Sequence, residues 1–122
     1  MKKKILIVDD EPSIVRLLSK RLKVNGYETF VAEDSYQCIK RAQELNPDLI
    51  LLDMKMPAGG GLVAFENLKA SVYTSTIPVI FVTAQPEEEV KKQVMELGAD
   101  GFIAKPFNGV DLLNTVKEIF AE

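Results

Sequence analysis

The chain has 122 residues, of which 47% are hydrophobic and 27% charged, and its formal net charge is −3. This length suits one domain with a hydrophobic core, and the acidic balance disfavours a nucleic-acid-binding surface, which is normally basic. The lack of histidine excludes His-ligated metals and Ser-His-Asp triads. The single cysteine excludes an intrachain disulfide, and no apolar run is long enough to span a membrane.

The first quarter of the chain contains strand, helix and strand signals in that order. Residues 4–8 predict a strand, and the uninterrupted apolar run over 5–8 indicates that it is buried on both faces of a sheet. Pro12 suits the first turn of a helix, whose apolar residues recur at helical spacing until Asn25 and Gly26 end it. Residues 27–32 mix polar and apolar side chains, which indicates a strand at an edge of the sheet.

The middle of the chain repeats this alternation. The second helix begins at Asp34 and Ser35, which are suitable capping residues, and it stops before Pro47. Residues 48–52 predict another strand, and the continuously apolar run over 49–52 indicates that it is buried. A loop is expected over 57–61 because this segment combines a proline with three glycines, and a third helix follows it.

The last third of the chain contains two further strand and helix pairs. Residues 78–82 predict a continuously apolar strand, and Pro86 suits the start of a helix that ends at Gly98. A short strand follows at 102–104. Asn108 is placed to cap the last helix, which carries apolar residues at helical spacing.

Five strands that alternate with five helices predict an α/β fold with a parallel sheet covered on both faces. The strand order 2-1-3-4-5, known from flavodoxin and a chemotaxis regulator, would place the continuously apolar strands in the centre and the mixed and short strands at the edges. We therefore expect a doubly wound, flavodoxin-like sheet in a single domain over residues 1–122.

Polar residues follow the strands at the end where such sheets bind ligands. Asp9 and Asp10 follow the first strand, Asp53 the third, Thr83 the fourth and Lys105 the fifth. Carboxylates at one rim raise one another's pKa unless a cation lies among them, and Mg²⁺ typically binds one or two carboxylates together with several waters. The first two aspartates alone would indicate a solvated turn with a helix cap, but with Asp53 beside them a cation site is favoured.

Four short motifs at these strand ends resemble the response-regulator receiver domain. They are VDDE at 8–11, LLDMKMP at 51–57, VTA at 82–84 and KPF at 105–107, and the match covers essentially the whole chain. Each motif alone is weak, but the four in this order are highly specific. The resemblance implies a phosphorelay domain of two-component signalling that catalyses only its own phosphorylation and dephosphorylation.

The resemblance also implies a role for each residue of the rim. Asp53 would accept a phosphoryl group from a phosphohistidine on a partner protein. Asp10 and Asp53 would bind Mg²⁺ directly, the backbone carbonyl of Lys55 would complete the protein ligands, and Asp9 would act through bound water. Lys105 would contact a phosphoryl oxygen as a point charge.

A conformational switch is implied by the same resemblance. Thr83 matches the hydroxyl that is drawn towards the phosphoryl group, and Phe102 matches the aromatic side chain that rotates into the vacated space. This shift would change the face formed by the fourth helix, the fifth strand and the fifth helix. The Lys105–Pro106 peptide bond resembles one that is cis in the family. Taken alone, Thr83 would be an ordinary strand residue and Phe102 a core residue.

Four features depart from the family pattern or lie outside it. The side chain of Lys55 could shield an acyl phosphate or point to water, and we expect slow self-hydrolysis. The three glycines of the 57–61 segment predict a mobile loop, because glycine adds backbone freedom. Phe102 lacks the hydroxyl of a tyrosine, and Cys38 is expected to be a small buried residue on a helix.

The resemblance implies two partners, a sensor histidine kinase or histidine phosphotransferase and a downstream effector. It implies no direct binding to nucleic acid or membrane. The protein is expected in the cytoplasm, as a monomer or as a phosphorylation-dependent homodimer.

A haloacid-dehalogenase-type phosphatase would instead carry phosphate on Asp9, but it requires a D-x-D motif and a longer chain. A receiver-like module that no longer takes phosphate would not bind Mg²⁺. A Rossmann or flavodoxin cofactor domain would need a glycine-rich first turn, whereas an acidic turn repels phosphate.

Overall fold

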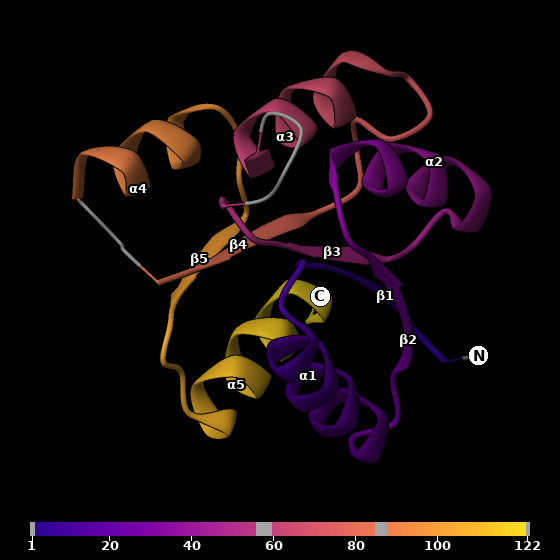
Figure 1. The fold of residues 1–122 in the computed structure, drawn as a ribbon, viewed down its shortest axis with the longest axis vertical. Helices are drawn as coiled ribbons and strands as arrows, with labels where there is room; N and C mark the ends of the chain where they lie inside the picture. The colour runs from indigo at the N-terminus through magenta and orange to yellow at the C-terminus, as the bar shows by residue number, and fades with distance from the viewer. Residues whose placement is uncertain (1, 56–59, 85–87, 122) are drawn as a thin grey trace.

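A computed structural model describes residues 2–55, 60–84 and 88–121 of the chain. In these residues, five parallel strands form one sheet in the order β2-β1-β3-β4-β5, four helices connect them, and a fifth helix follows the last strand (Figure 1). The strands are β1 (Lys4–Val8), β2 (Glu28–Ala32), β3 (Leu49–Leu52), β4 (Val79–Thr83) and β5 (Gly101–Ala104). The helices are α1 (Pro12–Val24), α2 (Ser35–Leu45), α3 (Gly60–Ala70), α4 (Glu88–Glu96) and α5 (Gly109–Phe120). The predicted doubly wound, flavodoxin-like fold is confirmed.

The sheet separates two hydrophobic cores. Helices α1 and α5 cover one face, and α2, α3 and α4 cover the other (Figure 1). The residues of β3 and β4 are all buried, and so are the last four residues of β1, because these strands have helices on both faces. The continuously apolar strands are thus central and the mixed and short strands are edges, as expected. Among the described helices, none is long and apolar enough to cross a membrane.

Most helix ends lie where the sequence predicts them. Pro12 is the first residue of α1, and the chain leaves α2 at Asn46, whose φ of 47° is left-handed. The side chain of Asp34 accepts a hydrogen bond of 2.8 Å from the backbone of Gln37 and so caps α2. Cys38 is fully buried in α2, and burial raises the pKa of its thiol to about 12, which keeps it protonated at neutral pH.

The start of α3 differs from the prediction. Gly60 and Gly61 were expected in a loop, but they form the first residues of the helix. Gly60 has a φ of +77°, and the Gly61 backbone N–H donates a hydrogen bond of 2.9 Å to the carbonyl of Met54. Glycine suits the positive φ of Gly60 because it has no Cβ. The predictions for residues 57–59 and for Pro86 lie outside the described residues.

Candidate functional site

Backbone hydrogen bonds of the sheet continue one residue past the strands and hold site residues at one rim. The N–H of Asp53 donates to the carbonyl of Val8 at 2.9 Å, which places Asp53 beside the residue that follows Val8, Asp9. The N–H of Lys105 donates to the carbonyl of Thr83 at 2.7 Å. The rim therefore brings together residues that lie far apart in the sequence, because parallel strands all end on the same side.

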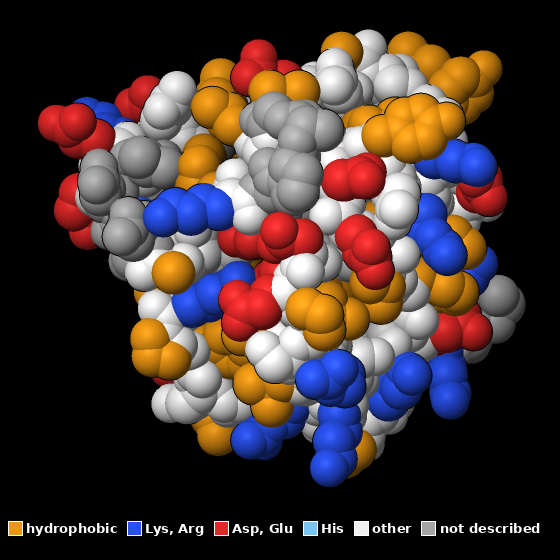
Figure 2. Space-filling model, viewed as in Figure 1, with side chains coloured by type: hydrophobic (Ala, Val, Ile, Leu, Met, Phe, Trp, Pro, Cys, Tyr) orange, Lys and Arg blue, Asp and Glu red, His pale blue; other side chains and the backbone are white. Residues whose placement is uncertain are grey.

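Three aspartates form an acidic cluster at this rim. One carboxylate oxygen from each of Asp9, Asp10 and Asp53 lies within 4.8 Å of the other two. Asp9 and Asp53 are 2% and 6% exposed, whereas Asp10 is exposed. Acidic side chains gather near the centre of this side of the molecule, and basic side chains concentrate over α1 (Figure 2).

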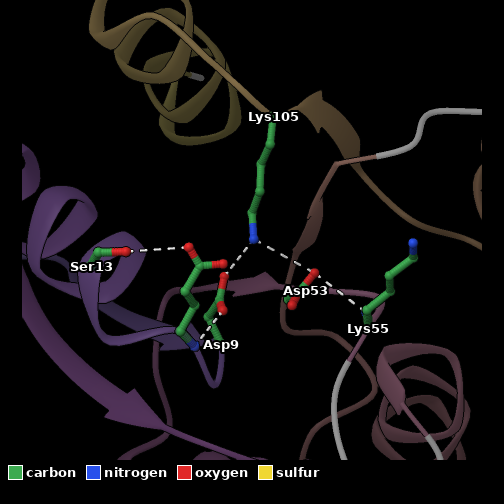
Figure 3. Close-up of polar contacts among 6 residues, drawn as sticks. Asp9, Ser13, Asp53, Lys55 and Lys105 are labelled. Atoms are coloured by element: carbon green, nitrogen blue, oxygen red, sulfur yellow. Dashed lines mark hydrogen bonds and ion pairs between the residues drawn. The ribbon is translucent and has the colours of Figure 1, made fainter.

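Lys105 extends from the end of β5 between two of these carboxylates (Figure 3). Its Nζ lies 2.8 Å from Oδ2 of Asp9 and 3.8 Å from Oδ1 of Asp53. The other oxygen of Asp9 accepts a 2.9 Å hydrogen bond from the backbone N–H of Glu11. Asp9 thus has a partner at each oxygen, and Lys105 contacts Asp9 more closely than it contacts Asp53. The peptide bond after Lys105 is cis.

The alternative role of the acidic pair as a helix cap does not match this geometry. The N-cap residue of α1 is Glu11, and its side chain makes no capping hydrogen bond. The carboxylate of Asp9 bonds the N–H of Glu11 instead, two residues on, as in an Asx turn. Asp10 is left exposed beside Asp9. The turn after β1 therefore directs its carboxylates to the rim rather than to the helix.

Burial and the neighbouring negative charges raise the pKa of the Asp53 carboxyl by more than the neighbouring lysine lowers it. Burial raises the pKa of Asp53, and the charge of Asp9 raises it further. The charge of Lys105 and a 3.3 Å hydrogen bond from the N–H of Lys55 lower the pKa, and Asp10 contributes a smaller increase. The pKa remains above its ordinary value overall. An additional cation at the rim would relieve this repulsion.

The donor set of the cluster fits a hard divalent cation. Its side-chain donors are all carboxylate oxygens, and their spacing allows one ion to contact more than one of them. Exposed Asp10 leaves part of the cluster open to water, which Mg²⁺ retains in its coordination shell. Asp9 is already occupied by Lys105 and Glu11, so Asp10 and Asp53 are the better placed for direct contact.

Lys55 lies beside Asp53 through its backbone. Its N–H donates to Oδ1 of Asp53, and its side chain is exposed. In Figure 3 this side chain extends away from the Asp53 carboxylate, whereas the side chain of Lys105 reaches towards it. Of the two lysines, Lys105 therefore supplies the positive charge close to the carboxylates.

Thr83 and Phe102 lie on the same face of the sheet. Phe81 is paired with Phe102, and Thr83 with Ala104, in the parallel register of β4 and β5. Side chains two residues apart in a strand share a face, so Thr83 and Phe102 are diagonal neighbours. Thr83 is 2% exposed, and Phe102 is partly buried against the core on the α3 and α4 side.

Two further contacts behind the rim were missed by the sequence reasoning. The hydroxyl of Ser35 donates a 2.9 Å hydrogen bond to the carbonyl of Gly60, and a Cβ on Gly61 would overlap the carbonyl oxygen of Asp53. The sequence pattern indicates Ser35 only as a capping residue and the glycines only as a loop. The sequence signal that could have indicated these contacts is the pair Gly60 and Gly61, which stands immediately before the apolar residues of a helix.

The fold and the rim define the class of protein to which the chain belongs. It is a flavodoxin-like α/β domain with an acidic turn after β1, where a nucleotide-binding domain would have glycines. Residues 5–117 match the family described as the response regulator receiver domain. The chain belongs to this family and is a receiver domain of two-component response regulators.

Individual relatives agree with this assignment. The phosphate regulon transcriptional regulatory protein PhoB of Escherichia coli (strain K12) is 38% identical over 119 residues, which are 98% of this chain and 52% of that protein. The alkaline phosphatase synthesis transcriptional regulatory protein PhoP of Bacillus subtilis (strain 168) is 40% identical over 119 residues, 98% of this chain and 49% of that protein. The chain spans about half the length of these curated relatives.

A solved structure shares the whole fold. The chemotaxis response regulator CheY4 of Vibrio cholerae is similar with a TM-score of 0.91 at 30% identity, over 98% of this chain and 99% of that one. The receiver family and the strand order predicted from the sequence are thus confirmed.

Proposed function

We propose that the domain accepts a phosphoryl group on the carboxylate of Asp53 from a phosphohistidine of a partner protein. The observation that carries this proposal is the convergence of Asp53, two further aspartates and Lys105 at the carboxyl ends of the strands. The lack of histidine in the chain agrees with it, because the donor imidazole must then come from another protein or domain.

The reaction transfers the phosphoryl group between two side chains. An oxygen of Asp53 forms a bond to phosphorus while the N–P bond of the phosphohistidine breaks, and the electron pair of that bond returns to the imidazole nitrogen. The product is an aspartyl phosphate, a mixed anhydride. Because Asp53 is a weak nucleophile, positioning and charge neutralisation supply most of the rate.

Residues of the rim have distinct roles in this step. Asp10 and Asp53 would hold Mg²⁺ directly with the backbone carbonyl of Lys55, and Asp9 would act through a bound water. The bound ion neutralises charge that develops on the phosphoryl oxygens. The ammonium of Lys105, 3.8 Å from Asp53, can move from its contact with Asp9 to a phosphoryl oxygen after transfer.

Phosphorylation is proposed to change the α4-β5-α5 face of the domain. The hydroxyl of Thr83 moves towards the phosphoryl group, and Phe102 rotates into the space that it leaves. The support for this coupling is that both side chains lie on one face of the sheet as diagonal neighbours. A local change in charge would thus bias an element with two arrangements.

The partners follow from the chemistry of the transfer. A sensor histidine kinase or a histidine phosphotransferase supplies the phosphoryl group, and a downstream effector protein or domain binds the altered face. The domain acts on its own aspartyl phosphate rather than on a free substrate, and it works in the cytoplasm, as a monomer or as a homodimer that forms on phosphorylation.

Phosphate mapping tests this proposal. The protein is incubated with acetyl phosphate and Mg²⁺, the acyl phosphate is reduced with borohydride, and the modified residue is identified by peptide mass spectrometry. Reduction of an aspartyl phosphate at residue 53 yields homoserine there, and Asp53→Asn, which preserves the shape of the side chain, should remain unmodified. Modification of Asp9 instead would favour the phosphatase interpretation, and no modification would favour a module that takes no phosphate.

The lifetime of the phosphorylated form is a separate part of the proposal. We expect slow self-hydrolysis because the long cationic side chain of Lys55, which is exposed and extends away from Asp53 in this structure, can swing over an acyl phosphate at the edge of the site. A half-life of only seconds, measured after acetyl phosphate is removed, would contradict this expectation while leaving the phosphoacceptor role intact.

A further inference from the structure

We infer that the first turn of α3, with the hydroxyl of Ser35 behind it, is a positioning element that holds the Asp53–Lys55 segment in its metal-binding geometry. This inference rests on the proposed function, because it concerns how the same site is built. The residues involved are Ser35, Gly60 and Gly61, none of which touches the reacting atoms.

Gly61 allows the helix backbone to lie directly against the backbone of Asp53. A Cβ built on Gly61 would overlap the carbonyl oxygen of Asp53 and come within 2.8 Å of the Cα of Met54. Real Cβ atoms essentially never approach backbone atoms so closely, and neither neighbour is a flexible side chain that could move away. The N–H of Gly61 also donates a 2.9 Å hydrogen bond to the carbonyl of Met54. Glycine at this position therefore permits a close contact with the backbone of Asp53 and Met54, which any larger side chain would prevent.

Gly60 and Ser35 fix the position of this turn. Gly60 has a φ of +77°, and a Cβ there would lie 2.9 Å from the carbonyl oxygen of Met54. Its own carbonyl accepts a 2.9 Å hydrogen bond from the hydroxyl of Ser35, the first residue of α2. Ser35 is 6% exposed, so this bond is shielded from water and is costly to lose. The start of α2 thus supports the start of α3, which supports Asp53.

The segment that follows β3 is consequently held from two sides. On one side the N–H of Asp53 bonds the carbonyl of Val8, and on the other side Gly61 contacts Asp53 and Met54. Two of the proposed metal ligands, the Asp53 carboxylate and the Lys55 carbonyl, extend from this short segment. A displacement of the backbone would therefore move both ligands at once, and a small misplacement of such groups has a large effect on binding and rate.

The test compares two glycine substitutions that differ in what a new Cβ would meet. Gly61→Ala forces Asp53 and Met54 to move, whereas Gly26→Ala adds a Cβ at a φ of +90° with no atom within 4 Å. Gly26 lies between α1 and β2, at the opposite end of the sheet. Mg²⁺ affinity is measured from backbone amide NMR shifts of Asp10 and Lys55 during titration with MgCl₂, and phosphorylation is measured as the initial rate with acetyl phosphate.

Gly61→Ala is expected to weaken Mg²⁺ binding about tenfold and to slow phosphorylation at least as much, as is typical when groups that orient metal ligands are changed. Gly26→Ala is expected to lower the melting temperature through backbone strain while both site readouts remain at wild-type values. A folded Gly61→Ala protein with wild-type Mg²⁺ affinity and rate would overturn the inference. Equal loss of Mg²⁺ affinity in Gly26→Ala would also overturn it, because the effect would then follow from general destabilisation.

Ser35 provides a second test if Gly61→Ala does not fold. Ser35→Ala removes the hydrogen bond to Gly60 without adding atoms, and it should weaken Mg²⁺ binding in the same direction, whereas Ser35→Thr, which retains the hydroxyl, should recover it. Wild-type Mg²⁺ affinity in Ser35→Ala would overturn the inference. If the wild-type protein binds Mg²⁺ but is not phosphorylated on Asp53, the proposed function fails, and the Mg²⁺ affinities still decide the positioning role.

Discussion

At the scale of single residues, the site contains three aspartates whose negative charge Lys105 offsets only in part. Lys105 pairs closely with Asp9 and more distantly with Asp53, and Asp10 stands exposed beside them. Burial and the charge of Asp9 raise the pKa of Asp53. The rim is therefore under electrostatic strain at neutral pH, and a cation or the loss of one negative charge should relieve it.

Asp53→Asn should increase the free energy of unfolding at neutral pH in buffer that contains EDTA. Because the folded pKa of Asp53 is raised, the stability that the protonated carboxyl contributes is fully present below its ordinary pKa of about 4 and is lost as the pH rises through the raised value. Asparagine avoids this loss. Urea unfolding at a series of pH values should show an advantage of the variant that grows from acid to neutral pH, and equal or lower stability at neutral pH would contradict the assignment.

Lys105→Met should destabilise the fold by about 3 kcal/mol, because it leaves the buried carboxylate of Asp9 without its cationic partner. The same substitution should tighten Mg²⁺ binding, since a competing positive charge is removed from the rim. Lys55→Met is a matched control, because it removes an exposed lysine nearby and should change stability by less than about 0.5 kcal/mol. Similar urea midpoints for the two variants, or weaker Mg²⁺ binding by Lys105→Met, would contradict this role of Lys105.

At the scale of the elements, the ends of the strands determine which residues meet. The N–H of Asp53 donates to β1 and the N–H of Lys105 donates to β4, so these two residues are held by a neighbouring strand rather than by a free loop. The β4 and β5 register then places Thr83 and Phe102 on one face. Strand β5 is one of the two edge strands, with only β4 as a neighbour in the described sheet, so a shift of β5 would disturb a single strand pairing.

Thr83→Val should uncouple phosphorylation from this shift. Valine retains the branched shape that fills the buried position but lacks the hydroxyl that would move towards the phosphoryl group. Phosphate incorporation from acetyl phosphate should stay within about threefold of the wild-type level, because Thr83 holds neither the metal nor the phosphorus. The change in the aromatic NMR signals of Phe102 on phosphorylation should disappear. A full change at Phe102 in the variant would contradict the proposed coupling.

The sequence predicts the elements well where burial leaves a clear pattern. Strands β1, β3 and β4 each contain an uninterrupted apolar run because helices cover both of their faces, and this property identifies them as central. The start of α3 could not be predicted in the same way. Glycines carry no apolar signal, and the partner that makes Gly61 necessary is the backbone of Asp53, whose approach is visible only in three dimensions.

At the scale of the whole molecule, the fold gathers chemistry that is spread along the chain into one rim. The positions of Asp9, Asp10, Asp53 and Lys105 after strands β1, β3 and β5 were enough to predict that they converge. The sequence could not predict that Lys105 contacts Asp9 more closely than Asp53, because this preference depends on a difference of one ångström between two distances. The fold class thus follows from patterns, whereas the arrangement of charges within the site requires coordinates.

The dependence of phosphorylation on a divalent cation tests the central claim most directly. The initial rate of phosphate incorporation from acetyl phosphate is measured across a series of Mg²⁺ concentrations and in EDTA, for the wild-type protein and for Asp10→Asn. The acidic cluster predicts a rate that rises to saturation with Mg²⁺, is abolished in EDTA, and requires more Mg²⁺ in Asp10→Asn. A wild-type rate in EDTA equal to the rate with Mg²⁺ would contradict the account.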